Sequence, residues 1–313
     1  MATFETPGSV SVQVRNQEGE VRVRVQDGST TTVTVEPLTA GAETRAHETR
    51  VDARPRGDGH EVVVEVPDRS GWLSTFGQMG TPVRVTVIVP PNADVRLETA
   101  SADVHVEGVV RLLDVETASG DVRFDEAGAA TDIRTASGDV SGRRVEGDVR
   151  VRTASGDVDV RDIGGSADIT TASGDVEVGH VTGRASLRAA SGDLRVGWAA
   201  GGLEAHTASG DVAVERSGGD CVVEAVSGDV ELGSAERGRA VLRSLSGDIV
   251  VGVAEGTFVR LDVETKSGDL MSDIDVGPEP NTQADGAPRL DLSAVTRSGD
   301  VRIRRTSAPV RWS

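Results

Sequence analysis

The stretch Thr117-Ala118-Ser119-Gly120-Asp121-Val122 decides the fold, because close copies of it recur along most of the chain. Its aspartate recurs first at a strict spacing of 18 residues, and then after steps of 19, 21 and 31. The aspartates of these copies are Asp103, Asp121, Asp139, Asp157, Asp175, Asp193, Asp211, Asp229, Asp248, Asp269 and Asp300. A fixed period over most of a chain is typical of repeat proteins, in which each repeat buries its apolar face against its neighbours.

Each repeat contains two short alternating segments. With the aspartate as position zero, positions −8, −6 and −4 are apolar or small, as in Leu113, Val115 and Thr117. After the aspartate the apolar positions become +1 and +3, as in Val122 and Phe124, and a second glycine cluster follows. Period-two alternation is typical of half-buried strands. The sequence therefore predicts an all-β fold, a single-stranded parallel β-solenoid (β-helix) of about eleven coils, each with a Ser-Gly-Asp corner.

Within the first 92 residues, 8–36 and 82–89 alternate in the same way, 39–60 is polar and less regular, and no segment repeats at 18 residues. We therefore predict a β-rich N-terminal capping region at 1–92 and an SGDV-repeat β-solenoid at 93–313. Gly277, Pro278 and Pro280 indicate an irregular surface loop at 272–289. A final coil from Leu290 is expected to close the end of the solenoid.

Composition excludes several classes of function. The 313 residues include 33 basic and 51 acidic side chains, a net charge of −18 that disfavours nucleic acid. No apolar run approaches the roughly 18 residues of a membrane span, and the N-terminus lacks the features of a signal peptide. We therefore predict no nucleic-acid partner, no membrane insertion and a cytoplasmic location.

The ladder of stacked aspartates has two interpretations. Neighbouring carboxylates about 4.8 Å apart repel by roughly 1 kcal/mol in water, so something must offset the repulsion. In the structural interpretation each aspartate accepts backbone N–H groups of its own corner. The corner ladder then consists of Ser119, Gly120, Asp121, Asp139, Asp157, Asp175, Asp193, Asp211 and Asp229. The alternative is a cation-binding β-roll, but such rolls carry aspartate at both corners, and the second corner here is poor in aspartate.

No enzyme signature accompanies the repeats. The serines at −2 share the parity of the buried positions, and a nucleophile would need one base beside one serine. The histidines are scattered over different segments, which also argues against zinc: His47, His60, His105, His180 and His206. Cys221 at −8 is expected to be a small core residue. A hexapeptide acyltransferase helix would need aliphatic residues where Gly128 and Arg134 stand. We predict no enzyme, no cofactor and no metal.

One glycine-flanked segment at 71–80 departs from the repeats. It concentrates apolar side chains at Trp72, Leu73, Phe76 and Met79. These residues form either a contact patch for a partner or a second copy, or a cap that covers the first coil.

The order of these features resembles a known bacterial family. An alternating N-terminal region, the strand from Val83 to Pro90 and the ladder of SGDV coils together are similar to the toastrack family of adhesin-like β-repeat domains. The resemblance covers nearly the whole chain and implies a link to cell-envelope stress or surface interaction. It brings no catalytic residues with it.

These observations predict a non-enzymatic adhesin-like β-solenoid scaffold or binding module with an unknown protein or glycan partner. Two alternatives stay open. One is a self-assembling structural protein joined through exposed strand edges, and the other is the cation-binding β-roll. We expect the residues that determine function to lie where the sequence departs from the repeat.

Overall fold

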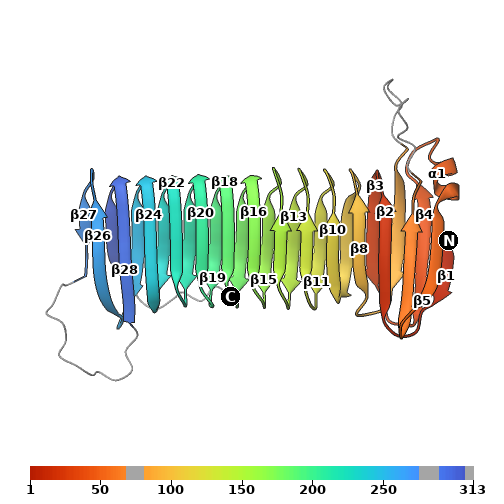
Figure 1. Ribbon diagram of the computed structural model, residues 1–313, viewed down its shortest axis with the longest axis horizontal. Coiled ribbons are helices and arrows are strands. Elements are labelled where there is room, and N and C mark those ends of the chain that lie inside the picture. The colour runs from red at the N-terminus through yellow and green to blue at the C-terminus, as the bar shows by residue number, and fades with distance from the viewer. Residues whose placement is uncertain (68–80, 275–288, 307–313) are drawn as a thin grey trace. The chain divides into compact units, whose positions relative to one another are not determined.

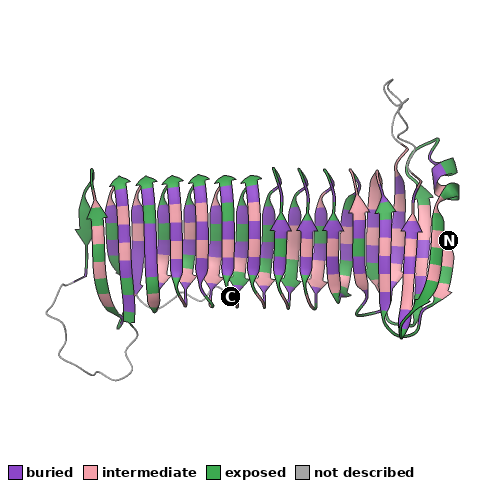
Figure 2. Ribbon diagram, viewed as in Figure 1, coloured by how far each residue is buried: buried purple, intermediate pink, exposed green. Residues whose placement is uncertain are grey.

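The computed structural model describes residues 1–67, 81–274 and 289–306. The chain forms two compact units, Met1–Val160 and Arg161–Ser313. Figure 1 shows strands side by side in each unit, and Figure 2 shows buried positions alternating with exposed ones along them. The predicted all-β parallel solenoid is confirmed.

Unit 1 consists of two sheets and one short helix. One sheet has the order β1-β4-β7-β3-β9-β11-β13, and the other has the order β14-β12-β10-β8-β2-β6-β5. The elements are β1 (Ala2–Glu5), β2 (Val10–Asn16), β3 (Gly19–Val25), β4 (Thr30–Pro37), α1 (Glu43–Glu48), β5 (Arg50–Arg56), β6 (Gly59–Glu65), β7 (Val83–Val89), β8 (Asp94–Thr99), β9 (Asp103–Val110), β10 (Leu112–Glu116), β11 (Val122–Ala127), β12 (Thr131–Arg134), β13 (Val140–Val145) and β14 (Val149–Arg152). β15 (Val158–Ile163) leads into unit 2.

Unit 2 also has two sheets. Their orders are β17-β19-β21-β23-β25-β29-β27 and β26-β28-β24-β22-β20-β18-β16. The strands are β16 (Ala167–Ser173), β17 (Val176–Val181), β18 (Ala185–Ser191), β19 (Leu194–Ala199), β20 (Leu203–Ser209), β21 (Val212–Ser217), β22 (Cys221–Ser227), β23 (Val230–Ala235), β24 (Gly238–Ser246), β25 (Ile249–Ala254), β26 (Phe258–Thr265), β27 (Leu270–Ser272), β28 (Arg289–Ser298) and β29 (Val301–Thr306).

The apolar positions of the repeat form the core between the two sheets. Equivalent residues pair in parallel register, as Val115 does with Ile133 in unit 1 and Leu187 with Ala205 in unit 2. All four side chains are fully buried. The register keeps every inward column apolar, because a shift by one residue would turn each column to solvent.

The final coil does not close the end of unit 2, contrary to our expectation. β28 lies between β24 and β26, and β29 lies between β25 and β27. The coil of β26 and β27 is therefore the outermost one, although it precedes β28 in the chain. Inward residues of β28, such as Leu292 and Ala294, are fully buried because they are covered on both sides.

The first coil of the chain is placed in the same way within unit 1. β2 lies between β6 and β8, and β3 lies between β7 and β9, in parallel in each case. Antiparallel strands β1, β4 and β5 complete the sheets. Unit 1 thus contains residues 1–92 together with the first SGDV coils, and the domain boundary at residue 92 stays a prediction.

Candidate functional site

The aspartate ladder is held by hydrogen bonds between coils. In unit 1 the Asp139 N–H donates to Asp121 Oδ1 at 3.1 Å, and in unit 2 the Asp211 N–H donates to Asp193 Oδ1 at 2.9 Å. Asp248, Asp300 and Asp269 continue this pattern in their spatial order. Each carboxylate thus accepts a hydrogen bond from the backbone of the next coil, whereas we had expected it to accept N–H groups of its own corner. The backbone N–H that each of these acceptor carboxylates binds offsets the repulsion between neighbours.

The corners of unit 1 are closed by threonine hydroxyls. The N–H of Gly138 donates to Thr135 Oγ1 at 2.9 Å, and the coils of Thr117 and Thr153 repeat this bond. A Cβ on Gly138 would lie 2.0 Å from the Gly120 carbonyl oxygen of the preceding coil, so glycine is required there by close approach. We call this arrangement the threonine-capped corner.

From Gly192 onward, unit 2 uses a different corner for the same motif. Gly192 has a φ of +141° and donates its N–H to the Ser209 carbonyl of the next coil at 3.0 Å. In this corner the threonine hydroxyl is a donor and not an acceptor: Thr296 Oγ1 donates to the Gly247 carbonyl at 3.1 Å. Ala189 and Ala225 occupy the threonine position in two of these coils and have no hydroxyl that could cap a glycine.

The corner serines and the glycine-flanked segment at 71–80 were also singled out from the sequence. Ser119 and its equivalents Ser137 and Ser155 are exposed, contrary to their parity, because the corner interrupts the alternation. Trp72, Leu73, Phe76 and Met79 lie outside the described residues. Among the residues that are described, no three His, Cys, Asp or Glu side chains converge as metal ligands. No helix in the same ranges is long and apolar enough to cross a membrane.

Cys221 lies in the core, where it is 1% exposed, and burial raises the pKa of its thiol to about 12. At pH 8 only about one thiol in ten thousand would be ionised. We therefore expect a thiol reagent such as DTNB to modify the native protein at less than a hundredth of the rate measured in guanidinium chloride, because the thiolate is the nucleophile. Stoichiometric modification of the native protein within minutes would contradict this placement.

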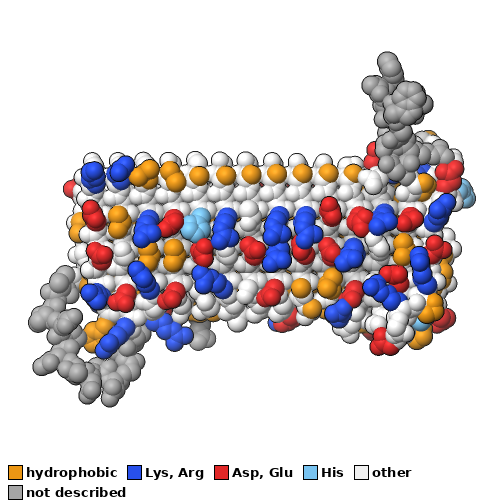
Figure 3. Space-filling view, in the orientation of Figure 1, with side chains coloured by type: hydrophobic (Ala, Val, Ile, Leu, Met, Phe, Trp, Pro, Cys, Tyr) orange, Lys and Arg blue, Asp and Glu red, His pale blue; other side chains and the backbone are white. Residues whose placement is uncertain are grey.

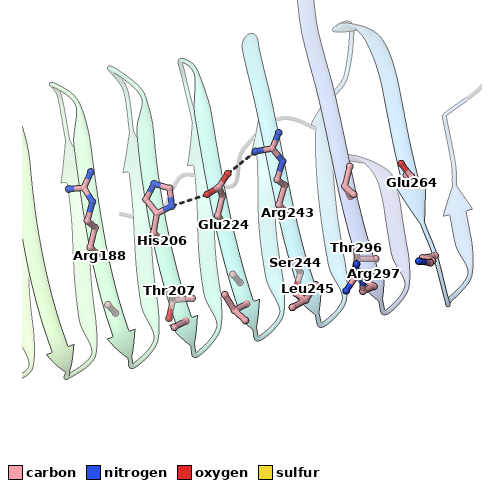
Figure 4. A pocket seen from close by; sticks show the side chains of 16 residues that line it. Arg188, His206, Thr207, Glu224, Arg243, Ser244, Leu245, Glu264, Thr296 and Arg297 are labelled. Atoms are coloured by element: carbon pink, nitrogen blue, oxygen red, sulfur yellow. Dashed lines mark hydrogen bonds and ion pairs between the residues drawn. The ribbon is translucent and has the colours of Figure 1, made fainter.

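An open groove of about 860 Å³ lies along the outer face of unit 2. It follows the sheet of β18, β20, β22, β24, β28 and β26 and is lined from positions −5 to −3 of successive coils. The position −5 side chains form a row, drawn in Figure 4 from Arg188 to Arg243. We call it the charged row, although it includes one valine; it consists of Arg188, His206, Glu224, Arg243, Val295 and Glu264.

The position −3 side chains form a ridge beside the charged row. The ridge consists of Ala208, Val226, Leu245, Arg297 and Lys266. Val226 is 49% exposed and Leu245 is 45% exposed, although both are aliphatic. Figure 3 shows hydrophobic side chains along this border of the face, beside the charged side chains. The ridge thus combines an exposed apolar stretch with two cations.

Ion pairs fix the charged row. His206 contacts Glu204 at 3.2 Å and Glu224 at 3.3 Å through its two ring nitrogens, and Arg243 contacts Glu224 at 2.8 Å. The contacts of Glu224 are drawn in Figure 4. Hydrogen bonds from His206 and Arg184 hold the pKa of the Glu204 carboxyl below its ordinary value. Arginine side chains therefore pair with both glutamates, and neither carboxylate is an available base.

Hydroxyl groups beside the row are also engaged. Thr207 Oγ1 donates to the Gly192 carbonyl at 3.5 Å, and Ser244 Oγ donates to the Gly228 carbonyl at 3.1 Å. A nucleophilic hydroxyl must instead be hydrogen-bonded to a base. The groove is accordingly suited to non-covalent contact.

The cations at the end of the ridge differ from those of the row. Within the described residues, neither Lys266 nor Arg297 forms an ion pair, whereas Arg188 and Arg243 each do. Four cationic side chains line the groove, those of Arg188, Arg243, Lys266 and Arg297, against the carboxylates of Glu224 and Glu264. The groove is therefore locally cationic in a chain whose net charge is −18.

Sequence reasoning missed this groove, although a signal was present. Position −3 is alanine in most coils and becomes Val226, Leu245, Arg297 and Lys266 in the last ones. Such departures from the repeat were expected to carry function, but the position was not singled out. Position −3 has the parity of the outward positions −7 and −5, so the period-two pattern already predicts that its side chains are exposed.

The comparisons with known proteins agree with this architecture. A family model described as Toastrack DUF4097 matches residues 9–219 and 181–304. The chain therefore belongs to the toastrack family, and its fold is a β-solenoid. No curated protein matches the chain.

Two solved structures are similar over most of their length. One, from Clostridium sporogenes ATCC 15579, is described as a "putative cell adhesion protein"; it has 8% identity and a TM-score of 0.23, with 95% of this chain and 93% of that chain covered. The other, from Bacteroides fragilis NCTC 9343, is described as a "putative adhesin"; it has 11% identity and a TM-score of 0.26, with 97% and 95% covered. The family assignment depends on the family model alone.

Proposed function

We propose that this chain is a non-enzymatic binding module that takes an extended acidic, partly aliphatic segment of a partner protein in the groove of unit 2. The observation that carries the proposal is the ridge, where exposed Val226 and Leu245 continue into Arg297 and Lys266, which form no ion pair within the described residues. Exposed aliphatic surface beside free cations is suited to a ligand with apolar side chains and carboxylates.

A protein segment fits the groove better than a glycan does. The described residues that line it are aliphatic, polar and charged, and none of them is a Trp, Tyr or Phe, the residues on which sugars usually stack. Trp198, on the other sheet of the unit, has its ring covered by the Arg216 guanidinium at 3.5 Å from the centroid. The cytoplasmic location inferred from the sequence stays a prediction.

The proposal is tested with fluorescent peptides of alternating Glu and Leu, compared with peptides of alternating Lys and Leu. Anisotropy is expected to detect binding of the Glu-Leu peptide alone, and the affinity should fall as salt rises. The double variant Lys266→Glu, Arg297→Glu should weaken binding by about tenfold or more, because it reverses both ridge cations.

A matched control changes net charge equally on the other sheet of unit 2. Arg195→Glu with Arg304→Glu reverses two cations of β19 and β29, and it should leave the affinity within about twofold. Equal loss in both variants would show general electrostatics and contradict the site. Preferential binding of heparin, which is lost in the ridge variant, would contradict the choice of a protein segment.

A further inference from the structure

The outermost coil of unit 2 leaves inward-facing residues incompletely covered. In β26, Val259, Leu261 and Val263 pair with Leu290, Leu292 and Ala294 of β28, which are fully buried. The three β26 residues are only half-buried, and the neighbouring Phe258 is 41% exposed. In β27, Leu270 is 53% exposed and Met271 is also exposed. Within the described part of the chain, no further coil covers this end of the core.

The backbone of β26 is also open along one side. Among the strands that the structure describes, β26 is the last of its sheet and pairs with β28 alone. An edge strand presents a row of free N–H and C=O groups, which proteins usually protect with proline, like charges or a covering segment. In unit 1, the edge strand β5 carries such protection in Pro55 and in Arg50, Arg54 and Arg56. β26, with the sequence FVRLDVET, has no proline and no run of like charge.

The sequence of β26 is complementary to itself in one antiparallel register. If a two-fold axis passes Leu261, this residue faces its own copy, Val259 faces Val263, and Arg260 faces Asp262. Both apolar pairs then fall on the core face, and both ion pairs fall on the outer face. Registers centred on Arg260 or Asp262 set like charges against each other, and one centred on Val263 sets Asp262 against Glu264.

Arg260 and Asp262 are exposed and available for such pairs. Neither forms an ion pair within the described residues. Antiparallel pairing across a two-fold axis is isologous, so it closes after two copies and does not continue into a fibre.

We propose that β26 is a dimerisation edge, at which two copies of this chain pair their β26 strands antiparallel around Leu261 and continue both the sheet and its apolar core. The inference rests on the edge and the sequence of β26 and not on the partner proposed for the groove, although Glu264 of β26 also lines that groove. The partner here is a second copy because the strand matches itself in hydrophobicity and in charge at once.

Light scattering and sedimentation test the proposal on the full chain. The wild-type protein is expected to show twice the mass of one chain at micromolar concentration and to dissociate on dilution. Arg260→Asp or Asp262→Arg alone should raise the dissociation constant by about tenfold or more, because each change opposes two pairs of like charges. The combined exchange should restore it to within about threefold.

A cysteine scan locates the axis. Cys221 is the only native cysteine and is buried. Leu261→Cys should form a disulfide-linked dimer on mild oxidation, since residue 261 meets its copy within bridging distance. Arg260→Cys is the matched control and should not cross-link, because its copy lies two residues away along the partner strand, beyond the roughly 7 Å limit between Cα atoms.

Three results would overturn the proposal. A monomeric mass at all concentrations would show that residues of the same chain or solvent cover the edge. A dimer that is unaffected by either charge reversal would place the interface elsewhere, and so would equal cross-linking at positions 260 and 261. The ridge variant is expected to lose binding of the Glu-Leu peptide and to keep the mass of the dimer. Either proposal can therefore be contradicted while the other holds.

Discussion

Phe124→Val and Gly142→Val are each expected to lower the free energy of unfolding by about 2 to 3 kcal/mol, whereas the double variant should lose about 1 kcal/mol or less. Phe124 in β11 and Gly142 in β13 are paired residues of adjacent coils. The ring of Phe124 occupies the space beside Gly142, where a Cβ would lie 2.1 Å from Phe124 Cζ.

The two substitutions are expected to compensate for each other because both residues stand at the same position of the repeat. Both residues occupy position +3, where the flanking coils carry the buried residues Val106 and Val160. Phe124→Val alone leaves a cavity that the glycine cannot fill, and Gly142→Val alone forces the ring aside. With both changes the column becomes four valines in succession, which is the arrangement that the neighbouring coils already have.

Chemical denaturation of the four proteins gives the coupling energy directly. We expect a favourable coupling of about 3 kcal/mol or more, well above the few tenths found for independent sites. Phe124→Val combined with Ala213→Val is a control, since Ala213 lies in unit 2 and faces outward in β21. Additive losses in the Phe124–Gly142 pair would show that the ring does not depend on the glycine.

The large features of this fold can be predicted from the repeat alone. The spacing of 18 residues places Phe124 beside Gly142 and aligns each inward column, so the strands and the core follow from simple alternation. The spatial order of the outer coils does not follow, because β26 and β28 have similar alternating patterns. Either could pair with β24, and only the packed structure places β28 beside it. Helix α1 and strand β5 were likewise missed, since 43–56 is polar and irregular in its alternation.

The candidate groove depends on the least predictable part of the repeat. Its ridge residues, such as Val226 and Leu245, follow the last inward position, and parity predicts that they are exposed but not that they border a groove. Their side chains face outward because Val226 and Leu245 still belong to β22 and β24 and follow an inward residue in the strand alternation. The corner itself cannot be predicted from its motif, because the same Thr-Ala-Ser-Gly-Asp-Val letters occur at Thr135 and at Thr171, and their hydroxyls are bonded differently.

That difference leads to opposite expectations for one substitution. Thr135→Val should lower the free energy of unfolding by about 1 to 3 kcal/mol, because it removes the acceptor of a buried N–H, that of Gly138. Thr171→Val should leave stability unchanged or raise it by up to about 1 kcal/mol. Thr171 is 3% exposed, and its Oγ1 has no hydrogen-bond partner.

The two variants are matched controls for each other, because valine has nearly the shape of threonine and the flanking motif is the same. Denaturation midpoints and the exchange rate of the Gly138 amide hydrogen provide two readouts. Faster exchange of that amide in Thr135→Val alone would show that the hydroxyl protects it. Equal destabilisation by the two substitutions would contradict the distinction between the corners, since strand propensity or packing would then explain both. Thr135→Val and Thr171→Val can change the free energy of unfolding differently only if the same hexapeptide forms different hydrogen bonds at the two corners. The neighbouring coils, which differ between the two corners, would then determine which hydrogen bonds form.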